Sequence, residues 1–287
     1  MSRIRIVADS TCDLCRELLE KYEVSIIPLC IVMDDQSFYD GMETTPEEIF
    51  AWADAKKTTP KTAAAPLDKA EEILAPFMDA GEDILFFGIS GEMSTTCNVV
   101  RLVAENREYD RLWVIDSRNL STGIGLQVLK AAELAKEGKR AEEIVAIISE
   151  ARDRVRASFV VDTLTYLARG GRCTAVTALL ANTLKLHPEI VVKDGTMGVS
   201  RKYRGSLDSA LLKYATDLKA ELLSADKKRV FITHSGCAAE TVDKIRSFLE
   251  SLDYFEEIFV TRAGGVISSH CGPGTLGILF YAGESDK

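Results

Sequence analysis

The chain has 287 residues, of which 46% are hydrophobic and 28% charged, and its formal net charge is −9. This size is enough for one large or two ordinary domains with a substantial buried core. The acidic balance argues against general nucleic-acid binding, which needs a basic face for phosphate contacts, and no apolar stretch approaches the roughly 18 residues of a membrane span.

The amino terminus and the cysteines favour a cytoplasmic protein. Met1 leads directly into a strand-like run at Ile4–Asp9 instead of a signal peptide. The chain has seven cysteines, an odd number without framework spacing, which indicates reduced thiols. Cys12 and Cys15 form a C-x-x-C pair, but no second pair or histidine lies nearby, so we expect Cys12 to pack at a strand-to-helix turn.

The first half of the chain predicts alternating strands and helices. Apolar runs indicate buried strands at about residues 3–8, 24–33, 84–89 and 112–115. Helices are predicted from the Thr45–Glu48 capping box, at about 67–79, after Ser94, and at about 122–137 and 141–154. This alternation is typical of a mainly parallel sheet with helices on both faces, in which ligands bind at the carboxyl ends of the strands.

Loops rich in serine and threonine follow several of these strands. They lie at Asp9–Asp13, Ile89–Thr96 and Asp116–Gly123, with a further one at Thr59–Pro66 before a helix. Capping of the next helix explains any one of these loops taken alone. Four such loops at one edge of a sheet predict an anion site, because helix amino termini and hydroxyl groups both donate to anions.

The second half predicts a separate lobe of strands and helices. Strands are expected near 158–161, 189–192, 229–234, 256–261 and 276–282, and helices at about 206–223 and 238–251. Residues 1–150 carry 16 Lys and Arg against 28 Asp and Glu, whereas residues 151–287 carry 19 against 16. This change in charge suggests two α/β domains, which we place at 1–155 and 156–287.

The segment Ser269–Thr275 is the strongest single candidate for a binding site. It places His270, one of only three histidines, beside hydroxyl groups and a Gly-Pro-Gly turn between two apolar runs. Glycine lets the backbone approach a ligand closely, and proline fixes one dihedral angle of the turn. The segment therefore looks suited to an anionic head group; the alternative is a histidine that only satisfies a turn carbonyl.

Several enzyme classes lack their signatures in this chain. The sequence has no G-x-S-x-G nucleophile elbow, no P-loop and no G-x-G-x-x-G after a strand. Its three isolated histidines and scattered cysteines form no metal-ligand set. Hydroxyl-rich loops with one placed histidine favour a binding protein over a catalyst, and we expect no cofactor.

Seven short motifs follow one another along the chain: Asp9–Leu14, Pro60–Thr62, Ile89–Ser94, Val114–Ser117, Leu167–Arg172, Lys193–Gly195 and His270–Gly274. Together they resemble the DegV family, bacterial fatty acid-binding proteins that serve as carrier subunits of fatty acid kinase. Each motif is weak alone, but their order covers nearly the whole chain. The resemblance implies two α/β domains with one long-chain fatty acid held in a buried tunnel between them.

The resemblance also implies roles for individual residues. The carboxylate would be bound by the hydroxyls of Thr62 and Ser94, with His270 close by and the backbone amides of the turn to Thr95 assisting. The chain departs from the family pattern after Thr62, where three alanines follow, at Thr95, where glycine is usual, and at Cys271, which is often threonine. These changes bear on acyl-chain preference and head-group geometry.

A kinase partner is implied as well. Arg169, together with Arg172, would face the kinase subunit, which phosphorylates the bound carboxylate with ATP to an acyl phosphate for phospholipid synthesis. The carrier would not be catalytic alone, and the fatty acid would be its ligand. Two other hypotheses stay open: a small-molecule hydrolase or phosphotransferase that uses His270 with Ser94, and a binding module for another anionic ligand.

Overall fold

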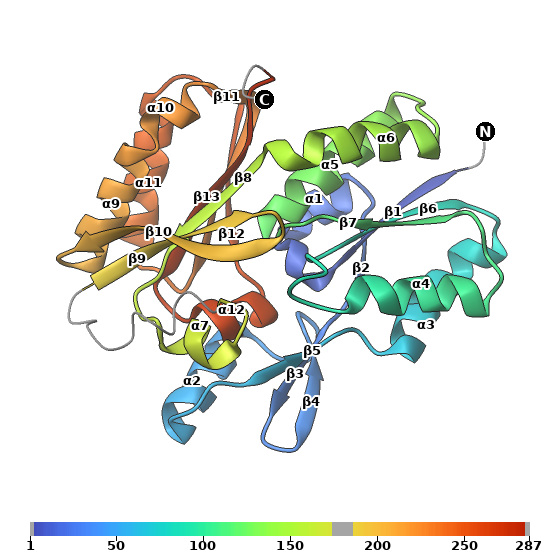
Figure 1. Ribbon diagram of the computed structural model, residues 1–287, viewed down its shortest axis with the longest axis horizontal. Coiled ribbons are helices and arrows are strands. Elements are labelled where there is room, and N and C mark those ends of the chain that lie inside the picture. Colours follow the sequence, from blue (N-terminus) through green and yellow to red (C-terminus); the bar gives the residue numbers. More distant parts are fainter. Residues whose placement is uncertain (1–2, 174–185, 285–287) are drawn as a thin grey trace.

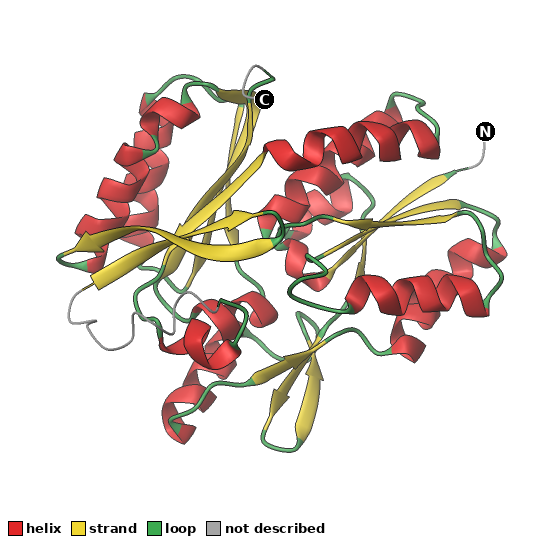
Figure 2. Ribbon diagram, viewed as in Figure 1, coloured by secondary structure: helices red, strands yellow, loops and turns green. Residues whose placement is uncertain are grey.

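The computed structural model describes residues 3–173 and 186–284, which fold into three β-sheets with helices packed against them (Figure 1, Figure 2). The predicted α/β class is therefore confirmed. One sheet is parallel and belongs to the amino-terminal half, one is mixed and belongs to the carboxyl-terminal half, and a small third sheet lies below the first two in the view of Figure 1.

The amino-terminal sheet has four parallel strands: β1 (Ile4–Asp9), β2 (Ser25–Ile27), β6 (Asp83–Gly88) and β7 (Leu112–Asp116). They lie in the order β2-β1-β6-β7. Side chains alternate between the two faces, so Val7 packs with one pair of helices and Ile6 with another. The helices are α3 (Leu67–Asp79) and α4 (Thr96–Asn106) on the first face and α5 (Thr122–Lys136) and α6 (Ala141–Ala151) on the second.

The carboxyl-terminal sheet has six strands: β8 (Val155–Val160), β9 (Leu186–Lys193), β10 (Thr196–Arg204), β11 (Ala225–Ser235), β12 (Glu257–Arg262) and β13 (Thr275–Ala282). Their order is β10-β9-β8-β13-β11-β12, and only β11 and β12 run parallel. The outer face is covered by α9 (Leu207–Asp217), α10 (Lys219–Leu222) and α11 (Ala239–Ser251). The inner face of this sheet packs towards α5.

A third sheet of three short antiparallel strands consists of β3 (Cys30–Met33), β4 (Gln36–Tyr39) and β5 (Lys61–Ala63) in the order β4-β3-β5. Beside it lie α2 (Pro46–Lys56), α7 (Thr165–Gly170) and α12 (Gly265–Cys271). The remaining short elements are η1 (Ser10–Cys12), α1 (Arg16–Lys21) and η2 (Arg152–Arg154).

The structure corrects several sequence predictions. The single strand expected at 24–33 is two strands in different sheets, because Pro28 has no backbone N–H and interrupts the ladder between Ile27 and Cys30. The segment expected to be a loop at Thr59–Pro66 contains β5, and the helix expected at 206–223 is divided at Leu218. The predicted capping box at Thr45 and Glu48 is present in full.

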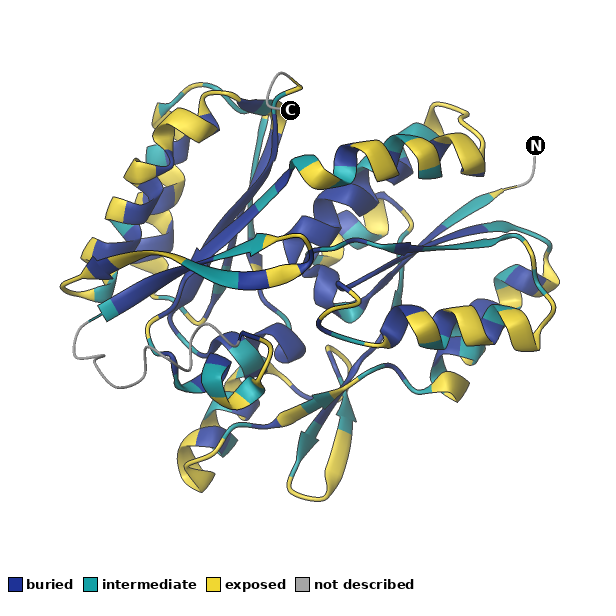
Figure 3. Cartoon of the chain, viewed as in Figure 1, coloured by how far each residue is buried: buried dark blue, intermediate teal, exposed yellow. Residues whose placement is uncertain are grey.

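Buried residues form the centre of both main sheets, and the outer faces of the covering helices are exposed (Figure 3). The largest apolar cluster includes residues of both halves, for example Ile124 of α5 and Leu279 of β13. The domain boundary near residue 155 stays a prediction. Within the described part of the chain, we find no helix with the length and apolarity that a membrane crossing requires.

Candidate functional site

A cavity of about 630 Å³ lies beside the carboxyl ends of the parallel strands, where the sequence places the anion site. This volume is typical of small-molecule sites. Its polar lining comes from β5, the loop after β6, the segment after α7, β10 and α12. The apolar lining residues are Leu29, Ala63, Ala64, Ile89, Met93, Leu120, Met197, Val266, Ile267 and Cys271.

The hydroxyl of Thr62 and the imidazole of His270 meet at one wall of this cavity. Thr62 Oγ1 lies 2.7 Å from His270 Nε2, although 208 positions separate the two residues along the chain. Thr62 is held in β5, where it pairs with Ile31 of β3. His270 is held in the last turn of α12. The predicted pair of side chains is therefore brought together by the tertiary structure.

The imidazole of His270 is neutral at neutral pH. Burial, with a smaller contribution from the positive charge of Arg172, lowers the pKa of His270 to about 4. A neutral imidazole has one donor and one acceptor nitrogen. With the proton on Nε2, His270 donates to Thr62 and leaves the Thr62 hydroxyl proton available to an anion in the cavity. The Nδ1 atom is buried without a hydrogen-bond partner and faces the backbone of Gly170.

Ser94 and Thr95 line the same cavity at the amino terminus of α4. Ser94 Oγ accepts from the backbone N–H of Thr96 at 3.3 Å and lies 3.0 Å from Thr96 Oγ1. Thr95 is the exposed N-cap residue, and its side chain makes no capping bond. The first N–H groups of a helix have no partner within the helix and carry partial positive charge. This wall of the cavity therefore favours an anion.

The two arginines predicted to face a partner occupy different positions. Arg172 lines the cavity, where its Nη1 donates to the carbonyl of Gly170 at 2.9 Å and its Nε to that of Met93 at 3.4 Å. Arg169 is exposed in the last turn of α7 and is not among the lining residues. Arg172 therefore contributes positive charge to the cavity itself, and Glu92, which also lines it, contributes a carboxylate of opposite sign.

Most hydroxyls of the predicted anion loops bond to other protein groups instead of lining the cavity. Ser90 donates to the carbonyl of Gly195 at 2.7 Å, and Ser121 donates to Asp13 at 2.5 Å. Ser10 donates to Asp40 at 2.8 Å. The prediction that all four loops form one anion site is therefore too broad: the described cavity lining takes hydroxyls from the β5 segment and from the loop after β6, but none from Asp9–Asp13.

The segment Ser269–Thr275 is the end of a helix followed by a short turn, and not the single turn that its sequence indicates. Its first three residues continue α12, and only Gly272–Gly274 form a turn before β13. Ser269 donates to the carbonyl of Gly265 at 2.7 Å, and Thr275 donates to the carbonyl of Cys271 at 2.9 Å. Because its neighbouring hydroxyls are satisfied by the backbone, His270 is the polar side chain of this segment that lines the cavity.

The apolar walls of the cavity were not found by sequence reasoning. A separate narrow hollow of about 20 Å³ lies between α12 and the carboxyl-terminal sheet and shares the lining residues Leu120, Ile267 and Cys271 with the main cavity. Phe159 and Leu279 line its far side. These residues come from separate elements and show only the ordinary pattern of core residues in the sequence, so no local signal marks them.

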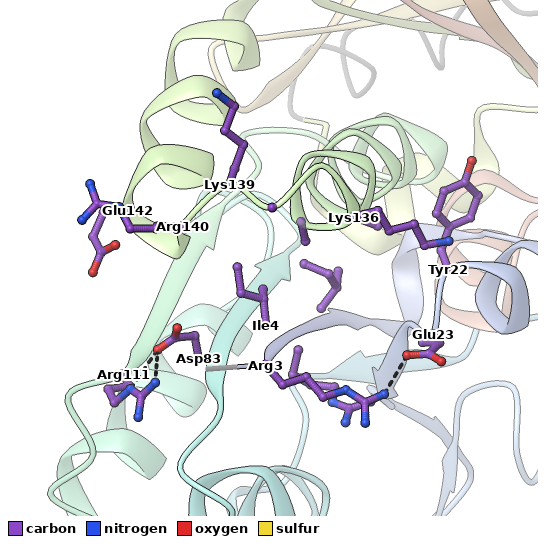
Figure 4. Close-up of a pocket in the computed structure, with 15 residues that line it drawn as sticks. Arg3, Ile4, Tyr22, Glu23, Asp83, Arg111, Lys136, Lys139, Arg140 and Glu142 are labelled. Carbon is purple, nitrogen blue, oxygen red and sulfur yellow. Dashed lines mark hydrogen bonds and ion pairs between the residues drawn. The ribbon is translucent and has the colours of Figure 1, made fainter. Parts of the chain in front are cut away.

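A second hollow, of about 590 Å³, lies at the opposite edge of the parallel sheet, beside the amino ends of β1 and β6. Figure 4 shows its charged side chains, some of which pair with one another. Arg3 pairs with Glu23 at 2.8 Å, and Arg111 pairs with Asp83 at 2.7 Å. This second hollow brings together no hydroxyl–imidazole pair, so we take the first cavity as the candidate site.

No group of three or more metal-ligating side chains occurs among residues 3–173 and 186–284. Cys12 is buried in η1, where burial raises its thiol pKa, and Cys15 is half-buried. Cys12 therefore packs at the strand-to-helix turn, as predicted.

Two buried groups near the site predict opposite effects of pH on stability. Burial raises the pKa of Asp9 from 3.8 to about 6, against hydrogen bonds from Thr11 and Ile89. The folded state then holds a proton that the unfolded state has lost, so about 3 kcal/mol of stability is lost as pH rises from about 4 to 6. For His270, with a pKa of about 4, the unfolded state holds the extra proton, so a rise through this range adds a similar amount.

We expect Asp9→Asn to make the slope of unfolding free energy against pH more positive than in the wild type, and His270→Gln to make it more negative. Urea unfolding of the three proteins between about pH 4 and 7 measures these slopes. Parallel curves for all three proteins would contradict the assignment of the two protonation states.

Comparison with known proteins places the chain in a family. The family model described as "Uncharacterised protein, DegV family" matches residues 3–283, and the chain belongs to the DegV family. A DegV domain-containing protein of Deinococcus radiodurans is 30% identical, with 96% of this chain and 97% of that protein covered. One of Clostridium perfringens is 34% identical over 72% of this chain and 74% of its own length.

Solved structures of the family resemble this fold over nearly its whole length. A DegV family protein from Thermus thermophilus, described as fatty acid-binding, has a TM-score of 0.88 and 30% identity and covers 98% of this chain and 99% of its own. A protein from Eubacterium ventriosum, described as binding stearic acid, has a TM-score of 0.84 and 25% identity, with 98% of each chain covered. The resemblance expected from the seven motifs is confirmed.

Proposed function

We propose that this protein binds a long-chain fatty acid, with its carboxylate at the cavity wall formed by Thr62, His270 and the amino terminus of α4. The observation that carries the proposal is the 2.7 Å pair of Thr62 and His270 at the wall of a cavity that also has a set of apolar lining residues. Fatty acid binding by structural relatives of 25% and 30% identity supports it. A fatty acid needs a site with polar groups for its carboxylate and an apolar wall for its acyl chain.

The head group is bound by hydroxyl and backbone donors. Thr62 donates its hydroxyl proton to one carboxylate oxygen, while Ser94 and the first amides of α4 serve the other. Because His270 is neutral, the compensating positive charge comes from Arg172 and from the helix terminus. Each such charge-assisted bond contributes about 1.5–3 kcal/mol.

The acyl chain supplies most of the binding free energy. A 16-carbon chain has about 14 methylene groups, each worth about 0.8 kcal/mol when buried, or about 11 kcal/mol before the cost of association. We place the chain along the apolar lining, past Leu120 and Ile267 towards the hollow between α12 and the carboxyl-terminal sheet. Small side-chain movements there would lengthen the tunnel.

We further propose that the carrier presents the carboxylate to a separate kinase subunit in the cytoplasm and is not catalytic alone. Exposed Arg169 supports a docking role, because it directly precedes Gly170, which contacts the His270 ring. Phosphorylation yields an acyl phosphate, for which alignment with the γ-phosphate of ATP is the main requirement. The alternative hypothesis of a hydrolase or phosphotransferase gains no support, because the hydroxyl of Ser94 bonds within its own turn and not to His270.

Lipid analysis tests the binding proposal. We expect an organic extract of natively purified protein to contain about one fatty acid per chain, and Thr62→Val to weaken fatty acid binding roughly tenfold to hundredfold through loss of one charge-assisted bond. Mass spectrometry and competition with a fluorescent fatty acid measure these quantities. Thr58→Val, at an exposed hydroxyl ahead of β5, is the matched control. A chain that neither carries nor binds fatty acid would refute the proposal.

A further inference from the structure

The three-stranded sheet contacts both ends of α12. At the carboxyl end, Thr62 of β5 meets His270 at 2.7 Å. At the amino end, Asp40, the residue that follows β4, accepts a hydrogen bond from the backbone N–H of Gly265 at 2.8 Å. Because β4 and β5 both pair with β3, these two contacts belong to one hydrogen-bonded unit. Two contacts, one at each end of α12, therefore hold the sheet against the helix that carries the imidazole.

Asp40 is held firmly in this position. Its side chain is buried, and its second oxygen accepts from Ser10 Oγ at 2.8 Å. Ser10 Oγ in turn accepts from the backbone N–H of Leu29 at 3.1 Å. The fit against α12 is close, because a Cβ at Gly265 would lie 2.9 Å from Asp40 Oδ1 and 2.5 Å from Ile31. The first turn of α12 thus has little freedom to move away from the sheet.

A second buried carboxylate bonds the neighbouring backbone group. Asp13 accepts from the N–H of Gly264 at 2.8 Å and from Ser121 at 2.5 Å. Asp13 follows β1 and Ser121 precedes α5, so this contact connects α12 to the parallel sheet and its helices. Of these two carboxylates, Asp40 is the one that follows a strand of the sheet carrying Thr62. The two carboxylates therefore connect the amino end of α12 to two different parts of the fold.

We propose that Asp40 is a positioning residue for the carboxylate site: it anchors the first turn of α12 to the sheet that carries Thr62 and so holds His270 within hydrogen-bond distance of the Thr62 hydroxyl. The ligand part of this inference rests on the proposed fatty acid binding. Asp40 does not itself line the cavity, so it acts through the helix.

Two readouts separate positioning from general structural support. The first is the ratio of affinities for a fatty acid and for the fatty alcohol of equal length, which shares the tail but lacks the carboxylate. We expect Asp40→Ala to weaken binding of the fatty acid roughly tenfold and binding of the fatty alcohol less than about threefold. The second is the imidazole NMR signal of His270, one of three histidines, identified by its absence in His270→Gln. We expect this signal to move and its pKa to rise from about 4 towards 6.5.

Matched variants complete the test. Asp35→Ala removes an exposed carboxylate from the β3–β4 turn of the same sheet and is expected to change neither readout. Asp40→Asn keeps an acceptor for Gly265 and is expected to restore most of the acid-to-alcohol ratio. If Asp40→Ala does not fold, Ser10→Ala, which removes one bond to Asp40, is expected to shift both readouts in the same direction by less.

The outcomes are distinguishable. A folded Asp40→Ala protein with an unchanged His270 signal and an unchanged ratio overturns the inference, as does equal weakening of acid and alcohol. A wild-type protein that binds neither ligand refutes the proposed function instead, and the His270 signal then decides on the positioning role alone.

Discussion

Replacing Asp13 by alanine is expected to lower the free energy of unfolding by about 2–6 kcal/mol, because the hydroxyl of Ser121 and the N–H of Gly264 would each lose their buried acceptor. Alanine also tolerates the left-handed backbone of this position, where φ is 50°, less well than aspartate, at a cost of about 1 kcal/mol. Urea unfolding at neutral pH measures the change.

Asparagine at the same position is expected to be much milder. Burial raises the pKa of Asp13 well above its usual range, so the charge itself is costly there. Asn keeps one acceptor oxygen, suits a positive φ and removes that charge. Glu17→Ala, at an exposed carboxylate on α1, is the control and is expected to change stability by less than about 0.5 kcal/mol. An Asp13→Ala protein as stable as Asp13→Asn would contradict the role of the acceptor.

Gly170→Ala is expected to abolish most of the carboxylate-dependent affinity. A Cβ at this position would lie 2.2 Å from His270 Nδ1 and 3.1 Å from Cε1, so the imidazole must rotate or α7 must move. Either change breaks the bond from Nε2 to Thr62. Overpacking of this kind also costs about 1–3 kcal/mol of stability. Fatty acid affinity should fall at least roughly tenfold, the equivalent of one hydrogen bond to a charged group.

The neighbouring glycine is the control for this variant. Gly171 has φ of 67°, and a Cβ there meets nothing within 4 Å. Gly171→Ala therefore introduces backbone strain of about 1–2 kcal/mol without contact to His270. Equilibrium binding of a fatty acid, and the Tm of each variant, distinguish the two effects. If both alanine variants bind fatty acid as tightly as the wild-type protein, the close contact between Gly170 and His270 has no part in binding.

Residues of the candidate site could be predicted to lie together from the sequence, but their environment could not. Thr62, Ser94 and His270 are the hydroxyl and imidazole groups expected to meet, and all three line one cavity. The turn expected around His270 is instead the end of a helix, since seven residues from Gly265 are too few to give a clear helical period. The protonation state of His270 follows from burial, which depends on residues far away in the chain.

Elements with a strong local pattern were determined by the sequence alone. Strands β1, β6 and β7 follow from short apolar runs, and α2 follows from the cap at Thr45. The third sheet was decided only by tertiary contacts: β5 has three residues, and only pairing with β3 makes it a strand. The role of Asp40 was also decided only by tertiary contacts. In the sequence Asp40 is simply an acidic residue before a glycine, and its contact with Gly265 spans 225 positions. Local patterns record what neighbouring residues prefer, whereas a cavity wall and a buried carboxylate are defined by groups that only the folded chain brings together.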